Sequence, residues 1–236
     1  MTEFEATEKL YHFTNFEAAC KILASKTLLL SSLSGLNDVN ESFRTIYSRD
    51  LDKSLSWKDL ESKFRQLSLS EDKDGALGFL NLPMWGNYAD KGKGACIVLD
   101  KNKFIRELDK QGLWHGEIDY VDKYDNDLII SSEEDIVRNH RIIFFQKDST
   151  WRFEQEYRVV GYNTALKSVD ISACLKWVIM YCMGEDSIFN TAEYKALAQI
   201  LGKERVDDIL AYGRFLNEES LTDSSGGNPV WSRELD

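Results

Sequence analysis

Apolar and polar positions change from strand-like to helical spacing within the first part of the chain. The run from Leu10 to Thr14 is short and mostly apolar, which predicts a buried strand. The next apolar residues recur at the spacing of one helix face, so we expect a helix that begins at Asn15 or Phe16. Thr14 and Glu17 have the spacing of a capping box, which favours Thr14 as the helix cap. The apolar face of this helix consists of Phe16, Ala19, Cys20 and Leu23.

Farther along, apolar runs of strand length and segments of helical spacing follow one another without a regular rhythm. Such an order predicts an α+β fold with a mixed or mainly antiparallel sheet and two C-terminal helices. Strands are predicted over residues 27–31, 76–80, 94–99, 117–121, 157–162 and 175–183. Helices are predicted for the segment that carries Trp57, Leu60, Phe64 and Leu67, from Ser131 through Glu134 to Phe144, and over 191–201 and 203–216.

Composition limits the size and number of domains. The chain has 236 residues, of which 43% are hydrophobic and 12% aromatic, so it can bury a sizeable core. Because it has two prolines and no low-complexity linker, we expect a single α+β domain over residues 1–217. Residues 218–236, rich in Glu, Ser, Gly and Asp, are expected to form a loosely ordered tail.

Charge and motif content argue against several classes of protein. The formal net charge of −11 disfavours a general coat of nucleic acid or anionic membrane, although a local basic groove is compatible with it. The three histidines and four cysteines have no ligand spacing, so no metal is expected. The phosphate-binding loop, the dinucleotide-binding glycine fingerprint and the serine nucleophile elbow are missing. Nucleotide triphosphatases, Rossmann dehydrogenases and serine hydrolases therefore have no motif support.

The expected location follows from three features of the sequence. The scattered cysteines indicate reduced thiols. The acidic N-terminus lacks the basic region of a signal peptide, and no apolar run reaches about 18 residues. We expect a cytoplasmic protein.

His12 is the first candidate for chemistry. A single histidine in an apolar strand is most often a satisfied core residue. However, the helix expected directly after it would point free N–H groups and the positive end of its dipole at whatever lies beside His12, which suits a pyrophosphate. Both interpretations stay open on the local pattern alone, and a cap at Thr14 is compatible with either.

A second candidate is the glycine-rich run from Met84 to Gly94. It carries Trp85 and Tyr88, two aromatic residues three positions apart. They could form a packed aromatic pair, or they could provide a stacking platform for a planar heterocycle.

The third candidate is the charged stretch from Trp151 to Val160. If it is a strand, Glu154, Glu156 and Arg158 share one face. A solvated edge strand would account for such charges. Alternatively, the guanidinium could hold one glutamate ionised so that it stabilises a cation, while the other orients a ribose hydroxyl or acts as a base.

Taken together, these segments resemble a bacterial family catalogued as a domain of unknown function, DUF2971. The resemblance runs from about residue 9 to 216, and the conjunction of motifs is more specific than any one of them. The matching motifs are Tyr11-His12-Phe13-Thr14, Asn37-Asp38-Val39-Asn40-Glu41, Met-Trp-x-x-Tyr-Ala-x-x-x-x-Gly over 84–94, and Trp-x-x-Glu-x-Glu-x-Arg over 151–158.

The opening strand and helix are also similar to the first motif of the ADP-ribosyltransferase fold, especially to the toxin branch that modifies DNA bases. The resemblance implies a split mixed or antiparallel β-sheet with flanking helices. The roles that it implies are NAD binding for His12, Thr14, Trp85, Tyr88, Arg158 and Asn37, and catalysis for Glu156 with Glu154 beside it. Two departures are clear: Phe13 replaces a small glycine, and the paired nicotinamide tyrosines spaced by ten residues are missing.

The resemblance therefore implies an NAD-dependent ADP-ribosyltransferase that modifies a macromolecule, with RNA or DNA favoured slightly over protein. NAD would be the substrate, and no metal would take part. Such enzymes often serve as toxins or antiphage effectors, so a neutralising partner protein is an additional expectation. The alternatives are a non-catalytic nucleotide- or protein-binding module and an NAD glycohydrolase.

Overall fold

The computed structural model describes residues 7–32, 62–123, 132–181, 191–213, 220–223 and 229–232. The chain divides into two compact units, each assembled from separate stretches of sequence. The first unit comprises Met1–Thr27, Leu69–Arg106 and Asp170–Asp236, and the second comprises Leu28–Ser68 and Glu107–Val169. The expectation of a single domain over 1–217 stays a prediction.

The first unit contains a mixed sheet with the strand order β14-β13-β12-β11-β5-β1, and the end of β4 pairs with β1. Its neighbours are antiparallel except for β11 and β12, which are parallel. The predicted α+β class with a mixed, mainly antiparallel sheet is confirmed. The strands are β1 (Lys9–Thr14), β5 (Ala95–Asp100), β11 (Leu175–Tyr181), β12 (Leu210–Gly213), β13 (Ser220–Asp223) and β14 (Pro229–Ser232), and β4 is Phe64–Glu71.

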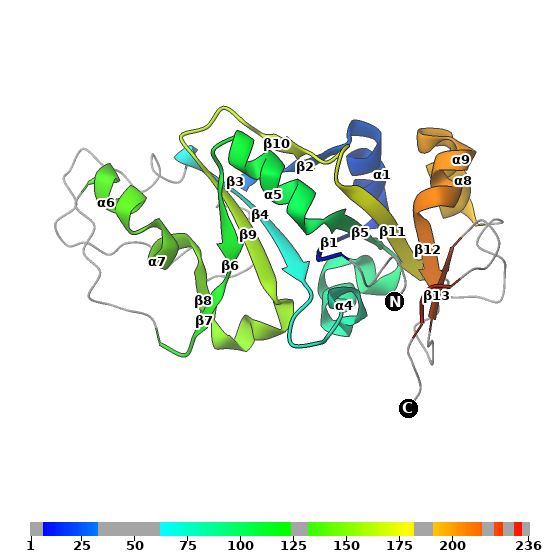
Figure 1. Cartoon of the computed structure of the whole chain (residues 1–236), viewed down its shortest axis with the longest axis horizontal. Coiled ribbons are helices and arrows are strands. Elements are labelled where there is room, and N and C mark those ends of the chain that lie inside the picture. The colour runs from blue at the N-terminus through cyan, green and yellow to red at the C-terminus, as the bar shows by residue number, and fades with distance from the viewer. Residues whose placement is uncertain are drawn as a thin grey trace. The chain divides into compact units, whose positions relative to one another are not determined.

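Helices lie on both sides of these strands. Helices α1, α8 and α9 lie together above the strands in the view of Figure 1, whereas α4 lies below them. Two of the strands, β13 and β14, fall within the tail expected from residue 218. The helices are α1 (Phe16–Ser25), η2 (Gly78–Leu80), α4 (Leu82–Tyr88), η3 (Asp90–Gly92), α8 (Ala192–Leu201) and α9 (Lys203–Ile209).

The connection between β1 and α1 differs from the expected capping box. The N-cap is Asn15, whose Oδ1 accepts a hydrogen bond from the backbone N–H of Ala18 at 2.8 Å. Thr14 is instead the last residue of β1, paired with Ala95 of β5. The prediction that Thr14 caps the helix is therefore wrong, because the strand pairing extends one residue farther than the sequence pattern showed and asparagine is an equally good cap.

Gly94 allows the segment after η3 to pass close to the end of β1. A Cβ atom on Gly94 would lie 2.2 Å from the carbonyl oxygen of Thr14 and 2.9 Å from backbone atoms of Ala89. Backbone atoms cannot give way as the end of a flexible side chain can. Only glycine therefore fits at position 94, where the segment that carries Trp85 and Tyr88 passes close to the end of β1.

We expect Gly94→Ala to lower the free energy of unfolding by about 3 kcal/mol, near the upper end for overpacking. Gly86→Ala is the matched control, because a Cβ atom at this exposed position in α4 would have nothing within 4 Å. Alanine there should raise stability by roughly 0.5–1 kcal/mol through helix propensity. Urea unfolding followed by circular dichroism measures both; equal stabilities of the two variants would contradict the close contact.

The second unit contains β4 beside β9, with β3 and β6 at their outer sides. A separate pair of parallel strands, β7 and β8, lies in the same unit. The elements are β3 (Ser31–Ser32), β6 (Trp114–Glu117), β7 (Asp119–Val121), α6 (Glu133–Arg138), α7 (His140–Phe144), β8 (Gln146–Asp148), η4 (Ser149–Glu154) and β9 (Glu156–Tyr162). Four elements have residues in both units: β4, β2 (Thr27–Leu29), α5 (Lys101–Lys110) and β10 (Ser168–Asp170).

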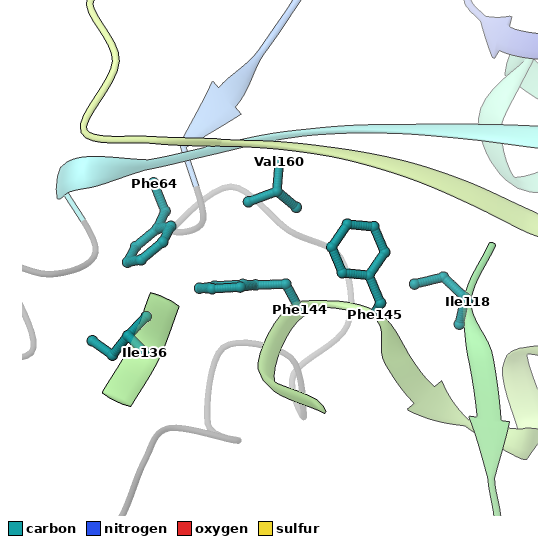
Figure 2. Packing of buried hydrophobic residues seen from close by; sticks show 6 residues of the cluster. All are labelled: Phe64, Ile118, Ile136, Phe144, Phe145 and Val160. Atoms are coloured by element: carbon teal, nitrogen blue, oxygen red, sulfur yellow. The ribbon is translucent and has the colours of Figure 1, made fainter. Parts of the chain in front are cut away.

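Apolar side chains from strands and helices form the core of the second unit. Figure 2 shows Phe64 on β4 and Val160 on β9 pointing toward Phe144 and Phe145. The rings of Phe64 and Phe144 lie 4.4 Å apart between centroids. This cluster, completed by Ile118 and Ile136, holds the segment before β8 against the strand that carries the charged residues.

Several secondary-structure predictions need correction. Phe64 and Leu67 belong to a strand instead of a helix, since Leu67 and Leu69 alternate with Ser68 and Ser70 and the strand pairs with its neighbours. A short apolar run is ambiguous by periodicity alone, which explains why residues 76–80 contain a 3-10 turn instead of a strand. The single helix predicted from Ser131 to Phe144 is two helices, α6, which is capped by Ser132 with Asp135, and α7, which starts after Asn139. Helix α9 ends at Ile209, after which β12 begins.

None of the helices within the described ranges is long and apolar enough to cross a membrane.

Candidate functional site

His12 and Thr14 lie on β1 in the first unit. Their register partners on β5 are Ile97 and Ala95. His12 is half-buried while its strand neighbours are buried. Thr14 lies directly before the N-terminus of α1, as the sequence predicted for the end of this strand.

Trp85 is packed into the core of the first unit. Its indole is 1% exposed, and its Nε1 donates a hydrogen bond to the carbonyl oxygen of Phe79 at 2.7 Å. Its ring contacts Phe13 edge-on at 5.2 Å and Tyr181 at 4.6 Å between centroids. Packing thus accounts for Trp85. Tyr88, one turn farther along α4, is half-buried.

The contact between Phe13 and Trp85 gives a reason for the large residue after His12. Phe13 points to the opposite side of β1 from His12 because successive side chains alternate along a strand. There it fills space against α4. Phe13 is therefore a residue that packs the first unit.

Glu154 and Glu156 are brought together by a tight turn in the second unit. Glu154 ends the 3-10 helix η4, and Gln155 adopts a left-handed conformation with φ of 45°. Strand β9 then starts at Glu156, so the two carboxylates do not lie on one continuous strand as the sequence suggested. The backbone of Glu156 is fixed on both sides, since its N–H donates to the Tyr120 hydroxyl at 2.9 Å and its carbonyl accepts from Ile118 at 3.0 Å.

Four charged side chains form a buried cluster, which we call the Glu–Lys–Arg cluster: Lys147, Glu154, Glu156 and Arg158. Arg158 binds both carboxylate oxygens of Glu156, through Nε at 2.6 Å and Nη2 at 2.7 Å. Lys147 Nζ lies 2.6 Å from Glu154 Oε2 and 3.3 Å from Glu156 Oε2. The residues are 4% exposed at Glu154 and 2% at both Glu156 and Arg158. The cluster contains two negative and two positive side chains.

The surroundings of Glu156 favour its ionised form. Burial by itself would raise the pKa of this carboxyl, but the charges of Arg158 and Lys147 outweigh burial. Hydrogen bonds from Arg158 and Ser68 act in the same direction, and the pKa falls to about 2. Glu156 is therefore an anion at neutral pH, although it is almost completely buried.

The cluster lies close to the surface in spite of its burial. Ser68, which hydrogen-bonds to Glu156, is an exposed residue of β4. Trp151, whose ring lies 4.9 Å from Lys147 Nζ, is half-buried.

The structure thus groups the predicted residues by unit. His12, Thr14, Trp85 and Tyr88 lie on adjacent elements of the first unit, and Glu154, Glu156 and Arg158 lie together in the second. The solvated edge strand is wrong as an explanation of the charges, because β9 lies between β4 and β6 and all three residues are buried. The remaining candidate, Asn37, lies outside the described residues.

Sequence reasoning missed Lys147, Ser68 and Tyr120. Lys147 precedes Glu154 by seven positions, and the turn η4 brings the two side chains together, so no local spacing signals the contact. Ser68 and Tyr120 reach Glu156 from other strands. Two buried glutamates need cations that neutralise them, so the lysines and arginines near Glu154 and Glu156 in the sequence were the one usable signal.

Within the parts of the chain that the structure describes, no group of three or more His, Cys, Asp or Glu side chains is arranged to hold a metal ion.

Comparison with solved structures finds DarT of Thermus sp. 2.9 in several complexes. The complex with NAD+ matches with a TM-score of 0.39 and 13% identity over 89% of this chain and 96% of that chain. The complex with carba-NAD+ gives 0.40 and 12%, over 89% and 97%. The complex with ADP-ribosylated ssDNA gives 0.40 and 12%, over 89% and 96%. A search of curated proteins found no match.

A family model supports the resemblance that the motifs indicated. It covers the glycine-rich run with Trp85 and Tyr88 and the stretch with Glu154, Glu156 and Arg158. Residues 84–159 match the family described as "Protein of unknown function (DUF2971)", which confirms the predicted resemblance to that family.

Proposed function

We propose that this protein is an NAD-dependent ADP-ribosyltransferase that modifies a macromolecule, with Glu156 as the catalytic carboxylate. The observation that carries the proposal is the Glu156 side chain, a buried carboxylate held as an anion by Arg158 and Lys147. Cleavage of the nicotinamide bond passes through an oxocarbenium-like state, and a fixed carboxylate near the ribose stabilises that positive charge.

NAD binding is assigned to residues of the first unit by their resemblance to the ADP-ribosyltransferase motif. His12 would hydrogen-bond the ribose, and Thr14, at the end of β1, would support it beside the pyrophosphate. Stacking on nicotinamide is assigned to Tyr88, since Trp85 is covered by protein. Asn37 keeps its assignment from the resemblance. Arg158 would act chiefly on Glu156, to which two of its donors are bound.

The proposed reaction balances without a metal or a redox partner. The bond between ribose C1′ and the nicotinamide nitrogen breaks, and its electron pair leaves with nicotinamide, which becomes neutral. A nitrogen or oxygen atom of the acceptor forms the new bond to C1′ and releases a proton. Glu156 stabilises the charge on the ribose, and Glu154 is the neighbouring carboxylate. The acceptor is RNA, DNA or protein, and nucleic acid is favoured by the motif resemblance alone.

The direct test is to incubate the full chain with NAD and with single-stranded DNA, RNA or a lysate protein fraction. We expect nicotinamide release and a gain of one ADP-ribose on one class of acceptor, measured by mass spectrometry. Free ADP-ribose produced without any acceptor would instead identify an NAD glycohydrolase. NAD that stays intact with every acceptor would contradict the proposal.

A second candidate is a non-catalytic module that binds a nucleotide or a protein. The observation in its favour is the mutual pairing within the Glu–Lys–Arg cluster, whose members are nearly all buried and could serve stability alone. This candidate predicts that NAD raises the melting temperature without being consumed. Thermal melts with NAD, run beside the nicotinamide assay, separate the two candidates.

A further inference from the structure

Lys147 contacts both carboxylates of the Glu–Lys–Arg cluster. Its Nζ lies 2.6 Å from Glu154 Oε2 and 3.3 Å from Glu156 Oε2. Its side chain is 6% exposed, so water contributes little to the solvation of this ammonium group. Arg158 contacts Glu156 through two nitrogen atoms, Nε and Nη2.

The contacts of the two cations differ in a way that assigns them different tasks. Arg158 orients Glu156 through a bidentate contact and is itself held by the carbonyl oxygen of Phe144 at 2.7 Å. Lys147 offers a single ammonium group to two acceptors, and its Nζ lies over the Trp151 ring at 4.9 Å. Without this ammonium group, the two buried carboxylates would lose a cation that lies 2.6 Å from Glu154 and 3.3 Å from Glu156. Like charges in a buried site repel strongly, so one proton would be taken up by the pair.

We propose that Lys147 is a positioning residue whose ammonium group, placed between the Glu154 and Glu156 carboxylates, keeps Glu156 in the anionic form that transfer requires. Lys147 acts through the carboxylates and does not itself touch the substrate. The catalytic part of this inference rests on the proposed function, whereas the charge state of the cluster does not depend on it.

The test compares three variants of the full chain: Lys147→Met, Lys147→Arg and the double variant Lys147→Met with Glu154→Gln. Titration of the glutamate side-chain carboxyl carbons by NMR reports the charge state directly, with Glu156→Gln identifying the Glu156 signal. In Lys147→Met, we expect the carboxylate pair to take up a proton at a pH at least about one unit higher than in the wild-type protein. Lys147→Arg, which keeps the charge, and the double variant, which removes one carboxylate, should titrate as wild type does.

The pH profile of nicotinamide release is the second measurement. If the protein cleaves NAD, the loss of activity at acid pH should begin at a higher pH in Lys147→Met than in the wild-type protein, by the same amount as in the NMR titration. The double variant should not show this shift. If no NAD is cleaved, the proposed function fails while the NMR titration still decides the role of Lys147. A Lys147→Met titration identical to wild type would overturn the inference.

Folding of Lys147→Met is the remaining control. If Lys147→Met does not fold, the double variant is the one that tests the inference. Of the four charged side chains of the cluster, it keeps the Glu156 carboxylate and the Arg158 guanidinium. The inference then requires the double variant to fold and to titrate as wild type does. A double variant as unstable as Lys147→Met would show that Lys147 acts through packing alone, and would overturn the inference.

Discussion

Replacement of Glu156 by glutamine is expected to reduce nicotinamide release by at least about 100-fold, with little change in the affinity for NAD. Glutamine keeps the size of the side chain and can still accept a hydrogen bond from Arg158. It loses the negative charge that would stabilise the oxocarbenium-like state. The effect should therefore fall on the rate of cleavage and much less on NAD binding.

The measurement is nicotinamide release under saturating NAD, with binding followed separately by calorimetry. The matched control is Glu17→Gln on α1, where the carboxylate side chain is 79% exposed and pairs with Lys21 on the surface. This control should keep wild-type activity. A Glu156→Gln variant that is as active as Glu17→Gln would remove Glu156 from catalysis and leave the buried cluster with a role in stability only.

Loss of Arg158 is expected to have the largest effect on stability. Arg158→Met should lower the free energy of unfolding by about 3–5 kcal/mol, because Glu156 would lose its bidentate partner while staying buried. Urea unfolding at pH 7 measures the change. The matched control is Arg138→Met, whose side chain is 72% exposed and pairs with Asp135 one turn away; it should change stability by less than about 0.5 kcal/mol.

A double variant separates the uncompensated charge from the lost packing. When Glu156→Met is added to Arg158→Met, no carboxylate is left without its arginine partner, and a large part of the lost stability should return. If Arg158→Met costs less than about 1 kcal/mol, or if Glu156→Met gives no recovery, the ion pair does not determine the stability of this region.

Acid pH tests the same pair without any mutation. The pKa of Glu156 is about 2 in the folded protein, against an ordinary value of 4.5, so the folded state binds fewer protons than the unfolded state between these values. Its contribution to stability is present above about pH 4.5 and is lost as the pH falls toward 2. Arg158→Met removes the largest cause of the lowered pKa, so this acid-dependent loss should become smaller.

Local pattern predicted much of the first unit. The runs predicted over 10–14, 94–99 and 175–183 correspond to strands β1, β5 (Ala95–Asp100) and β11 (Leu175–Tyr181). Helix α8 begins beyond Thr191 and ends before Gly202, as expected. These segments have long apolar runs or clear helical spacing, and their burial follows from that spacing. The prediction failed for residues 64–67 and for 210–213, where pairing with another strand overrides helix-like spacing.

The residue types at the candidate site were also visible in the sequence. Glu154, Glu156 and Arg158 stood out by their spacing, and so did His12 and Trp85. Their environments were not visible, since burial of the charges contradicts the solvated edge strand and packing encloses Trp85. Periodicity places a residue on a face of its own element, but it does not identify what covers that face.

By itself, the sequence determined the α+β class, the resemblance to DUF2971 and the set of chemically capable residues, because these depend on local periodicity and on motifs written in consecutive positions. Only the tertiary structure decided which charges meet. Lys147 reaches Glu154 and Glu156 through the turn η4, and Ser68 and Tyr120 reach Glu156 from separate strands. The charge state of a buried carboxylate depends on neighbours at distances of about 3 Å, and strand pairing and chain turns bring those neighbours together.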